Sequence, residues 1–245
     1  MPQGARGSKH FGSVVSETLP VPGAPGLQVR LRRSAQARRL SLRVGRADGR
    51  VTLSLPLHAP LSDARAFVAE QAGWIARHVA TAPPVRVVCV GGTVPILGRE
   101  RPVVAGIGTS ARLEGEAVAV AEDDRAAPRI KALLVSLARA HLMEAVARHA
   151  ATLGEVPAAM RLRDTRSRWG SCSSHRELMF SWRLVMAPLE VLDYVAAHEV
   201  AHLRHMDHSP RFWRQVEILV PDHAPHRDWL RREGAALHAV DFGGR

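Results

Sequence analysis

The motif His198-Glu199-Val200-Ala201-His202, within a segment of helical periodicity, constrains this chain more than any other feature. Histidines four residues apart lie on one face of a helix, one turn apart, so two neutral imidazoles can bind one metal ion. Glu199 lies about 100° round the helix from His198, where it can take a proton from water beside that ion. Two imidazoles with this glutamate suit zinc, and a catalytic zinc needs a third protein ligand while one position stays open.

A third ligand is available after the motif. His208 lies six residues after His202, beyond the expected helix end and just before a helix start at Ser209-Pro210. A chain reversal there can return His208 to the metal, so we predict it as the third ligand of a single zinc ion. His205 shares the face of His198 and His202, and three side chains in line on a straight helix cannot easily converge on one ion. The alternatives to His208 are His205, His223 and His226.

The expected elements are segregated along the chain. Alternating apolar residues separated by Gly and Pro turns predict strands. A first pair, 27–44 and 51–55, is joined by a hairpin turn at 47–50. Several short strands follow within 85–121. A last pair, 158–169 and 177–187, is joined by a polar hinge at 170–175. Apolar stripes preceded by Ser or Pro predict helices at 62–80, 128–153, 188–205, 209–220 and 225–237. Strands that precede a cluster of helices indicate an α+β fold.

We expect three parts in this chain. Residues 1–25, rich in Gly, Pro and Ser, predict a flexible tail. Residues 26–124 form a β-rich N-terminal region with one helix, and residues 125–245 form the metal-binding domain. Whether the β-rich region is a separate domain or joins the catalytic sheet stays open.

Composition excludes several classes of protein. Of 245 residues, 46% are hydrophobic and 23% charged, which is typical of a globular protein rather than a disordered one. No run of 18 apolar residues occurs, so we expect no membrane-spanning helix and no membrane partner. The N-terminus lacks the apolar core of a secretory signal. Two cysteines make no disulfide framework and fit a reducing compartment, so we expect a cytoplasmic protein.

The net charge is +11, and arginine accounts for all but two of the 34 basic residues. Arginine pairs well with phosphate, so this excess is compatible with nucleic acid or nucleotides as partners. A GC-rich genome gives the same excess without any such partner. Several arginines cluster around the predicted hairpin, where a phosphate-binding surface and a solvated strand face are equal alternatives. They are Arg30, Arg32, Arg33, Arg38, Arg39 and Arg43.

Other residues near the motif are weaker candidates. Arg168, Trp169 and Arg183 can bind a substrate carboxylate or phosphate or stabilise an oxyanion; the alternative is a buried tryptophan and arginines in ion pairs. Cys172 is disfavoured both as a nucleophile and as a zinc ligand. Tyr194, one turn before His198, is better explained by packing than by a role in a cleft.

These residues also carry a family resemblance. The stretch from Ser167 to Trp213, SRWGSC…HEVAHLRHMDHSPRFW, resembles the YgjP-like zinc metallohydrolases, which belong with the SprT-like group and the minimal gluzincin-like metallopeptidases. Upstream, RRSAQARRLSLRV, RVTLSLP and FVAEQAGWIARH are similar to the family's N-terminal hairpin and helix, so the resemblance covers most of residues 28–240.

The resemblance implies a zinc site of His198, His202 and His208 with Glu199 as the catalytic base. It also implies a zincin-like core, in which the active-site helix lies beneath a small twisted sheet. An edge strand beside the cleft would pair with a peptide, and the candidates are 178–185 and the segment before Trp169. Asp207 stands where the family often has Asn, and it could act as an acceptor for a ligating histidine.

We therefore expect a zinc-dependent hydrolase, and a metallopeptidase acting on peptides or proteins is the leading hypothesis. The second hypothesis is a phosphohydrolase of nucleoside triphosphates on the same zinc site. The third is a zinc-stabilised nucleic-acid-binding module without catalysis, which the presence of Glu199 disfavours. An exposed edge strand beside the metal would favour the peptidase, converging arginines the phosphohydrolase, and a closed four-ligand site the structural module.

Overall fold

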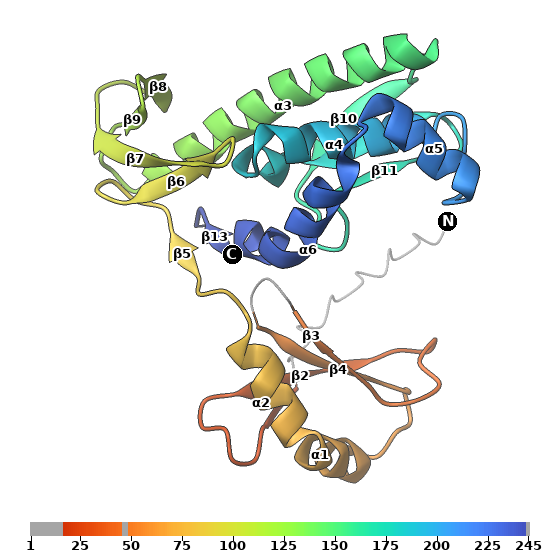
Figure 1. The fold of residues 1–245 in the computed structure, drawn as a ribbon. Coiled ribbons are helices and arrows are strands. Elements are labelled where there is room, and N and C mark those ends of the chain that lie inside the picture. Colours follow the sequence, from red (N-terminus) through yellow and green to blue (C-terminus); the bar gives the residue numbers. More distant parts are fainter. Residues whose placement is uncertain (1–16, 46–48, 244–245) are drawn as a thin grey trace, which may run out of the picture. The chain divides into compact units, whose positions relative to one another are not determined.

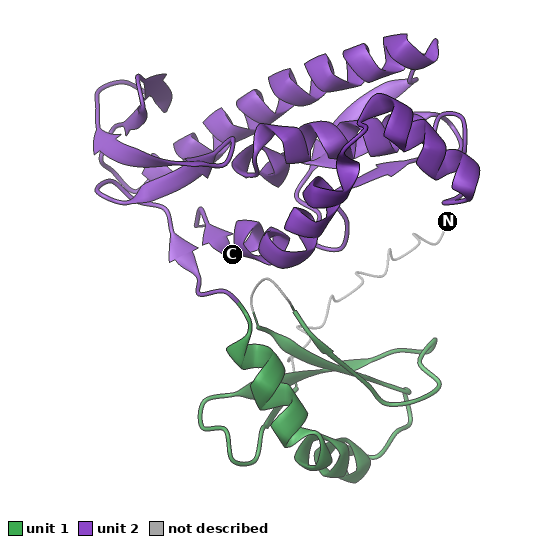
Figure 2. Ribbon diagram, viewed as in Figure 1, with its two compact units in different colours: residues 1–82 green, residues 83–245 purple. Residues whose placement is uncertain are grey.

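The computed structural model describes residues 17–45 and 49–243 (Figure 1). The chain divides into two compact units, residues 1–82 and residues 83–245, and each is described by itself (Figure 2). Most of the expected tail and residues 47 and 48 of the expected turn lie outside the described residues. The boundary expected from the sequence lies between residues 124 and 125, whereas the two units of the structure meet between residues 82 and 83.

The first unit is a four-stranded sheet covered on one face by two helices (Figure 1). Its strands, in sheet order, are β1 (Thr18–Pro20), β2 (Gln28–Arg33), β4 (Val51–Leu55) and β3 (Ser41–Val44). β3 and β4 are antiparallel, as the predicted hairpin requires, whereas β2 and β4 run parallel. The tail expected for residues 1–25 is wrong at β1, which pairs with β2 because Leu19 and Val21 are buried in the core.

Two helices cover this sheet where the sequence predicted one. They are α1 (Leu61–Glu70) and α2 (Ala72–Ala80), with Gln71 between them. Alternate residues of the strands face the helices, so Val29, Leu53 and Leu55 are buried against apolar side chains of α1 and α2. The other face of the sheet carries the intervening polar residues.

The second unit begins with small sheets and a long helix. The helix α3 (Ala126–Leu153) ends at Gly154, which adopts a left-handed conformation with φ +63°. One sheet has the order β6 (Thr93–Ile96), β7 (Arg99–Ala105), β9 (Ala117–Val120) and β8 (Arg112–Glu114). A second sheet consists of two paired strands, β5 (Arg86–Val87) and β13 (Val240–Asp241). The strands from 93 to 120 share one core with α3, so they belong to the second unit and the division falls before them.

The sheet beside the motif has the order β10 (Ala159–Arg163), β12 (Glu177–Ser181) and β11 (Gly170–Cys172). Two expectations are wrong here. Part of the expected polar hinge is the strand β11, and the expected strand over 177–187 ends at Ser181 and continues as the 3₁₀ helix η1 (Trp182–Met186). β12 is the central strand, so 178–185 is not an edge strand.

Three helices complete this unit: α4 (Leu189–Ala201), α5 (Pro210–Leu219) and α6 (His223–Ala239). α5 starts as predicted, with Ser209 at the N-cap and Pro210 in the first turn. α4 carries the motif and packs against α3, α5, α6 and β11. The mixture of helices and several small sheets confirms the α+β class. None of the helices described is long and apolar enough to cross a membrane.

Candidate metal centre

Three imidazole groups converge at the end of α4. His198 lies in α4, His202 is the residue directly after it, and His208 lies in the loop that precedes α5. Their ring nitrogens lie within 4.8 Å of one another. The Nε2 atoms of His198 and His208 are 3.2 Å apart. Two nitrogen ligands of a tetrahedral zinc ion are separated by about 3.3 Å, so the donor set fits such an ion. This is the only such group of His, Cys, Asp or Glu side chains among the described residues.

A chain reversal after α4 brings His208 to the other two histidines. The Nδ1 atom of His202 lies 2.8 Å from the carbonyl oxygen of His205. A carbonyl can only accept, so Nδ1 carries the proton and Nε2 keeps its lone pair for a metal. His205 thus orients the imidazole of His202 through its backbone carbonyl.

Asp207 has a different partner from the one expected. Its carboxylate accepts a hydrogen bond from the backbone N–H of Ser209, at 3.3 Å, and so stabilises the turn before α5. The acceptor for His202 is the backbone carbonyl of His205, and Asp207 acts on His202 only through its charge. The expectation that Asp207 accepts from a ligand is therefore not met.

Aromatic rings enclose the imidazoles. Phe212 is fully buried and stacks on His202 at 4.4 Å between centroids, while its edge contacts His198 and His208. The ring centroids of Trp213 and His198 are 5.7 Å apart. Burial lowers the pKa of His198 to about 3, with the neighbouring His202 and His208 adding to the effect. His198 is therefore neutral at pH 7, the state in which imidazole binds a metal.

Glu199, next to His198 in the chain, is buried, with 5% of its surface exposed. Burial raises the pKa of its carboxyl to about 8, and the positive charge of Arg168 opposes that rise. A divalent cation at the three histidines would further favour the carboxylate form. The environment thus suits a group that accepts and returns a proton near neutral pH.

The edge strand β11 lies directly against Glu199. A Cβ atom placed on Gly170 would be 2.5 Å from Oε1 of Glu199 and 2.6 Å from its Cγ, so only glycine fits there. Gly170 lies in the segment expected as a polar hinge. Its signal was available, because a glycine within a strand often marks the close approach of another group.

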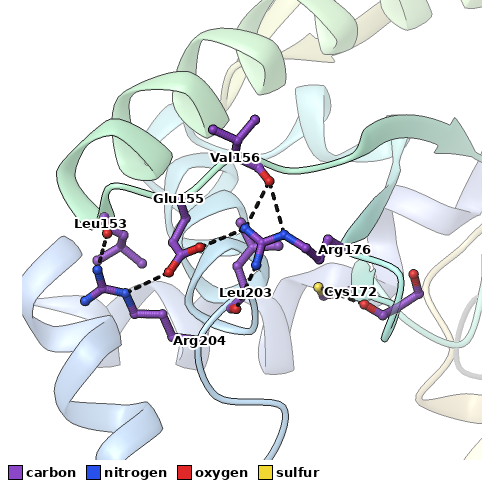
Figure 3. Close-up of polar contacts among 8 residues, drawn as sticks. Leu153, Glu155, Val156, Cys172, Arg176, Leu203 and Arg204 are labelled. Atoms are coloured by element: carbon purple, nitrogen blue, oxygen red, sulfur yellow. Dashed lines mark hydrogen bonds and ion pairs between the residues drawn. The ribbon is translucent and has the colours of Figure 1, made fainter.

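The end of α4 is anchored by a network of ion pairs (Figure 3). Glu155, just after α3, accepts hydrogen bonds from Arg176 at 2.7 Å and from Arg204 at 3.1 Å. Arg176 also donates to the carbonyl of Leu203, and Arg204 donates to that of Leu153. Hydrogen bonds from these two arginines lower the pKa of Glu155. The network joins the ends of α3 and α4 to the turn before β12.

Arg183 is a structural residue, so its expected substrate-binding role is wrong. It is 6% exposed and donates to the Asp164 carboxylate at 2.6 Å. Its Nη1 donates to the carbonyls of Leu237 and Val240, both at 2.9 Å. With its donors directed at these partners, the guanidinium is not available to a substrate.

The two other expected substrate residues differ from each other. Trp169 stacks on His238 at 4.6 Å and lies against Gly234, which is a packing arrangement. Arg168 is exposed, and its charge acts on Glu199. Of the three expected substrate residues, only Arg168 is thereby linked to the metal centre.

Cys172 and Tyr194 behave as expected from packing. Burial raises the pKa of the Cys172 thiol, so it is not an activated nucleophile. Tyr194 is 5% exposed, contacts His198 edge-on and stacks on His223. His223 also stacks on Trp213, so the rings of Tyr194, His223 and Trp213 lie together beside His198, an arrangement with no signal in the sequence.

The fold and the site define an α+β protein in which a His-Glu-x-x-His helix and a following loop form a three-histidine centre able to hold a metal. The chain belongs to the YgjP-like family: the model described as YgjP-like, metallopeptidase domain, matches residues 38–233. This membership and the histidine cluster together support a metal-dependent hydrolase.

A solved structure also matches part of the chain. It is the metallopeptidase zymogen abylysin of Pyrococcus abyssi, 22% identical, with a TM-score of 0.33; the match covers 37% of this chain and 90% of that one. No curated protein matches the chain.

Proposed function

We propose that this protein is a zinc-dependent metallopeptidase in which Glu199 is the catalytic base. The observation that carries the proposal is the position of β11. This strand is at the edge of its sheet, pairs only with β12 among the described strands, and lies against Glu199 through Gly170. Its free edge offers backbone groups to an extended peptide, which would place a peptide bond beside the histidine cluster.

The residues divide the chemistry between them. A zinc ion held by His198, His202 and His208 would polarise a carbonyl oxygen and make water a stronger acid. Glu199 accepts the proton of the attacking water and returns it to the leaving amine. Its raised pKa suits both steps, because the carboxyl can hold the proton between them.

One observation favours a second function, hydrolysis of nucleoside triphosphates. Two arginines act on the site by charge: Arg168 on Glu199, and Arg227 on His198. Arg227 lies 4.7 Å from the centroid of Trp213. Guanidinium groups in such positions can bind phosphates. Against the third hypothesis, a structural zinc module, the described residues group three candidate ligands, and a zinc ion bound by three protein ligands would keep one position open.

We also propose a reducing compartment, the cytoplasm. Cys89 and Cys172 are both free thiols, and Cys89 is exposed.

The test compares the zinc-loaded wild type with Glu199→Gln on an unstructured protein and, separately, on nucleoside triphosphates. We expect the wild type to cleave the protein and the variant to be at least about 100-fold slower, since it lacks the base. Metal analysis should find one zinc ion per chain in both, because glutamine leaves the three imidazoles in place.

Two results would contradict the peptidase. Phosphate or pyrophosphate release that is lost in Glu199→Gln, without cleavage of protein, would assign the site to nucleotides. Full zinc occupancy with no hydrolysis of either substrate would favour the structural module.

A further inference from the structure

Most of the net positive charge of this protein lies in its first unit. Residues 1–82 contain 12 of the 34 Lys and Arg residues but only 4 of the 23 Asp and Glu residues, a net charge of +8 out of +11. The other two thirds of the chain has a net charge of only +3. Basic residues are about equally frequent in both units, so the difference comes from the scarcity of Asp and Glu in the first unit, where most of the positive charge is unbalanced. Charge indicates a partner when it clusters on one surface.

Within this unit, arginines share the open face of the sheet. Across the strands, Arg30 of β2 is level with Thr52 of β4, which is level with Arg43 of β3. In the next row, Arg32 is level with Ser54, and Ser54 with Ser41. α1 and α2 cover the opposite face, so these side chains point to solvent, and all three arginines are exposed.

These arginines differ from others in the chain. Arg33, whose side chain lies on the other side of β2, donates to the carbonyls of Leu57 and Ala59. Many arginines of the second unit form ion pairs, as Arg86 does with Glu100. By contrast, the guanidinium groups of Arg30, Arg32 and Arg43 have no hydrogen-bond or ion-pair partner among residues 17–45 and 49–243.

The dimensions of this face suit a nucleic-acid backbone. Arg30 and Arg32 are two residues apart on one strand, about 7 Å, and Arg30 and Arg43 are two strand spacings apart, about 9.5 Å. That span corresponds to about three base steps of a duplex, at about 3.4 Å each. Arginine and hydroxyl side chains are the usual donors to phosphate oxygens.

We propose that the open face of the β1–β4 sheet binds the phosphate backbone of a nucleic-acid duplex without sequence preference. The face has Arg, Ser and Thr at its centre and neither an aromatic nor an acidic side chain on β2, β3 or β4. Proteins that hold single strands stack the bases on aromatic rings, and this face offers none. Backbone contacts carry no sequence information, so binding depends on charge and salt.

The experiment measures binding of the full chain to a fluorescent 20-base-pair DNA duplex, by anisotropy over a range of NaCl concentrations. The variant Arg30→Gln/Arg43→Gln removes two charges from the open face. We expect it to lower the affinity at 100 mM NaCl about tenfold or more, and to reduce the slope of log K against log[NaCl] by about 2.

The matched control is Arg65→Gln/Arg77→Gln, which removes two exposed charges from α1 and α2 on the covered side of the sheet. It should change affinity less than about threefold, since these arginines would touch no phosphate. Circular dichroism and zinc content should be unchanged in both variants, which separates this surface from the metal centre.

Three outcomes would overturn the proposal. An equal loss of affinity in both double variants would show that DNA binding depends on the net charge of the protein and not on this face. Tighter binding of a single strand than of the duplex would contradict a backbone site without stacking. Binding of anionic phospholipid vesicles with no binding of the duplex would assign the face to a membrane surface. Equal binding of an RNA duplex of the same length would support recognition of the backbone alone.

Discussion

At the scale of single residues, the close approach of Gly170 limits the position of the Glu199 carboxylate. Glu199 is buried, and the backbone of β11 lies where any side chain larger than hydrogen would meet its carboxylate. The glycine therefore permits the strand and the helix to approach closely. It also places the strand edge proposed for peptide binding next to the base.

We predict that Gly170→Ala lowers kcat/KM for a peptide at least about tenfold, because displacing a catalytic group by about 1 Å can cost about 100-fold. Zinc content, measured by metal analysis, should stay at one ion per chain, since the histidines are untouched. The matched control is Gly73→Ala in α2, where the added methyl group has room, and its activity should equal that of the wild type. Full activity in Gly170→Ala would show that Glu199 does not depend on this contact.

At the scale of elements, Arg183 ties η1 to the loop after β10 and to the end of α6. It donates to Asp164 and to the carbonyls of Leu237 and Val240. Burial alone would raise the pKa of Asp164, but the hydrogen bond and charge of Arg183 lower it below the ordinary value of 3.8. The pair therefore stabilises the fold while this carboxyl is ionised.

We predict that Asp164→Asn lowers the free energy of unfolding at pH 7 by about 1–2 kcal/mol, a modest value because 38% of the Asp164 side chain is exposed. A carboxyl with a lowered pKa contributes fully above its unfolded pKa and loses that contribution as pH falls through the folded pKa. The difference in free energy of unfolding between variant and wild type should thus be constant from pH 7 to about 5 and shrink below about 4.

Urea unfolding at several pH values would measure this gap. The control is Asp228→Asn, whose pairing with Arg231 is on the surface, and it should change stability by less than about 0.5 kcal/mol at any pH. A gap for Asp164→Asn that persists undiminished at pH 3 would mean that its cause is not the ionised carboxylate.

At the scale of the whole molecule, two separate cores are built from one chain. One comprises the β1–β4 sheet with α1 and α2, and the other comprises the remaining elements around α3 and α4. Each core supplies its own burial of apolar surface, which is the main source of folding free energy. The three histidines and Glu199 all belong to the second unit.

We predict that residues 83–245 fold without the first unit and bind one zinc ion per chain. Their thermal transition should lie within about 5 °C of the corresponding transition of the full chain, a shift of about 1–2 kcal/mol. Metal analysis and thermal unfolding by circular dichroism would check this. A truncated chain that is unfolded or free of zinc would show that the second core needs the first.

Features that depend on local geometry could be predicted from the sequence. The α+β class and the family follow from periodicity and motif, and both are confirmed. The grouping of His198 and His202 follows from helical spacing, and the return of His208 from the helix start at Ser209. The structure brings these three together, while metal binding by them stays a prediction.

Contacts between segments far apart in the chain could not be predicted in this way. The domain boundary depends on the strands of 93–120 packing on α3, and the edge position of β11 depends on pairing with β12. The burial of Arg183 depends on carbonyls more than 50 residues away in the chain. Such contacts leave no periodic trace in the sequence, because each is set by the packing of whole elements and not by the spacing of neighbouring residues.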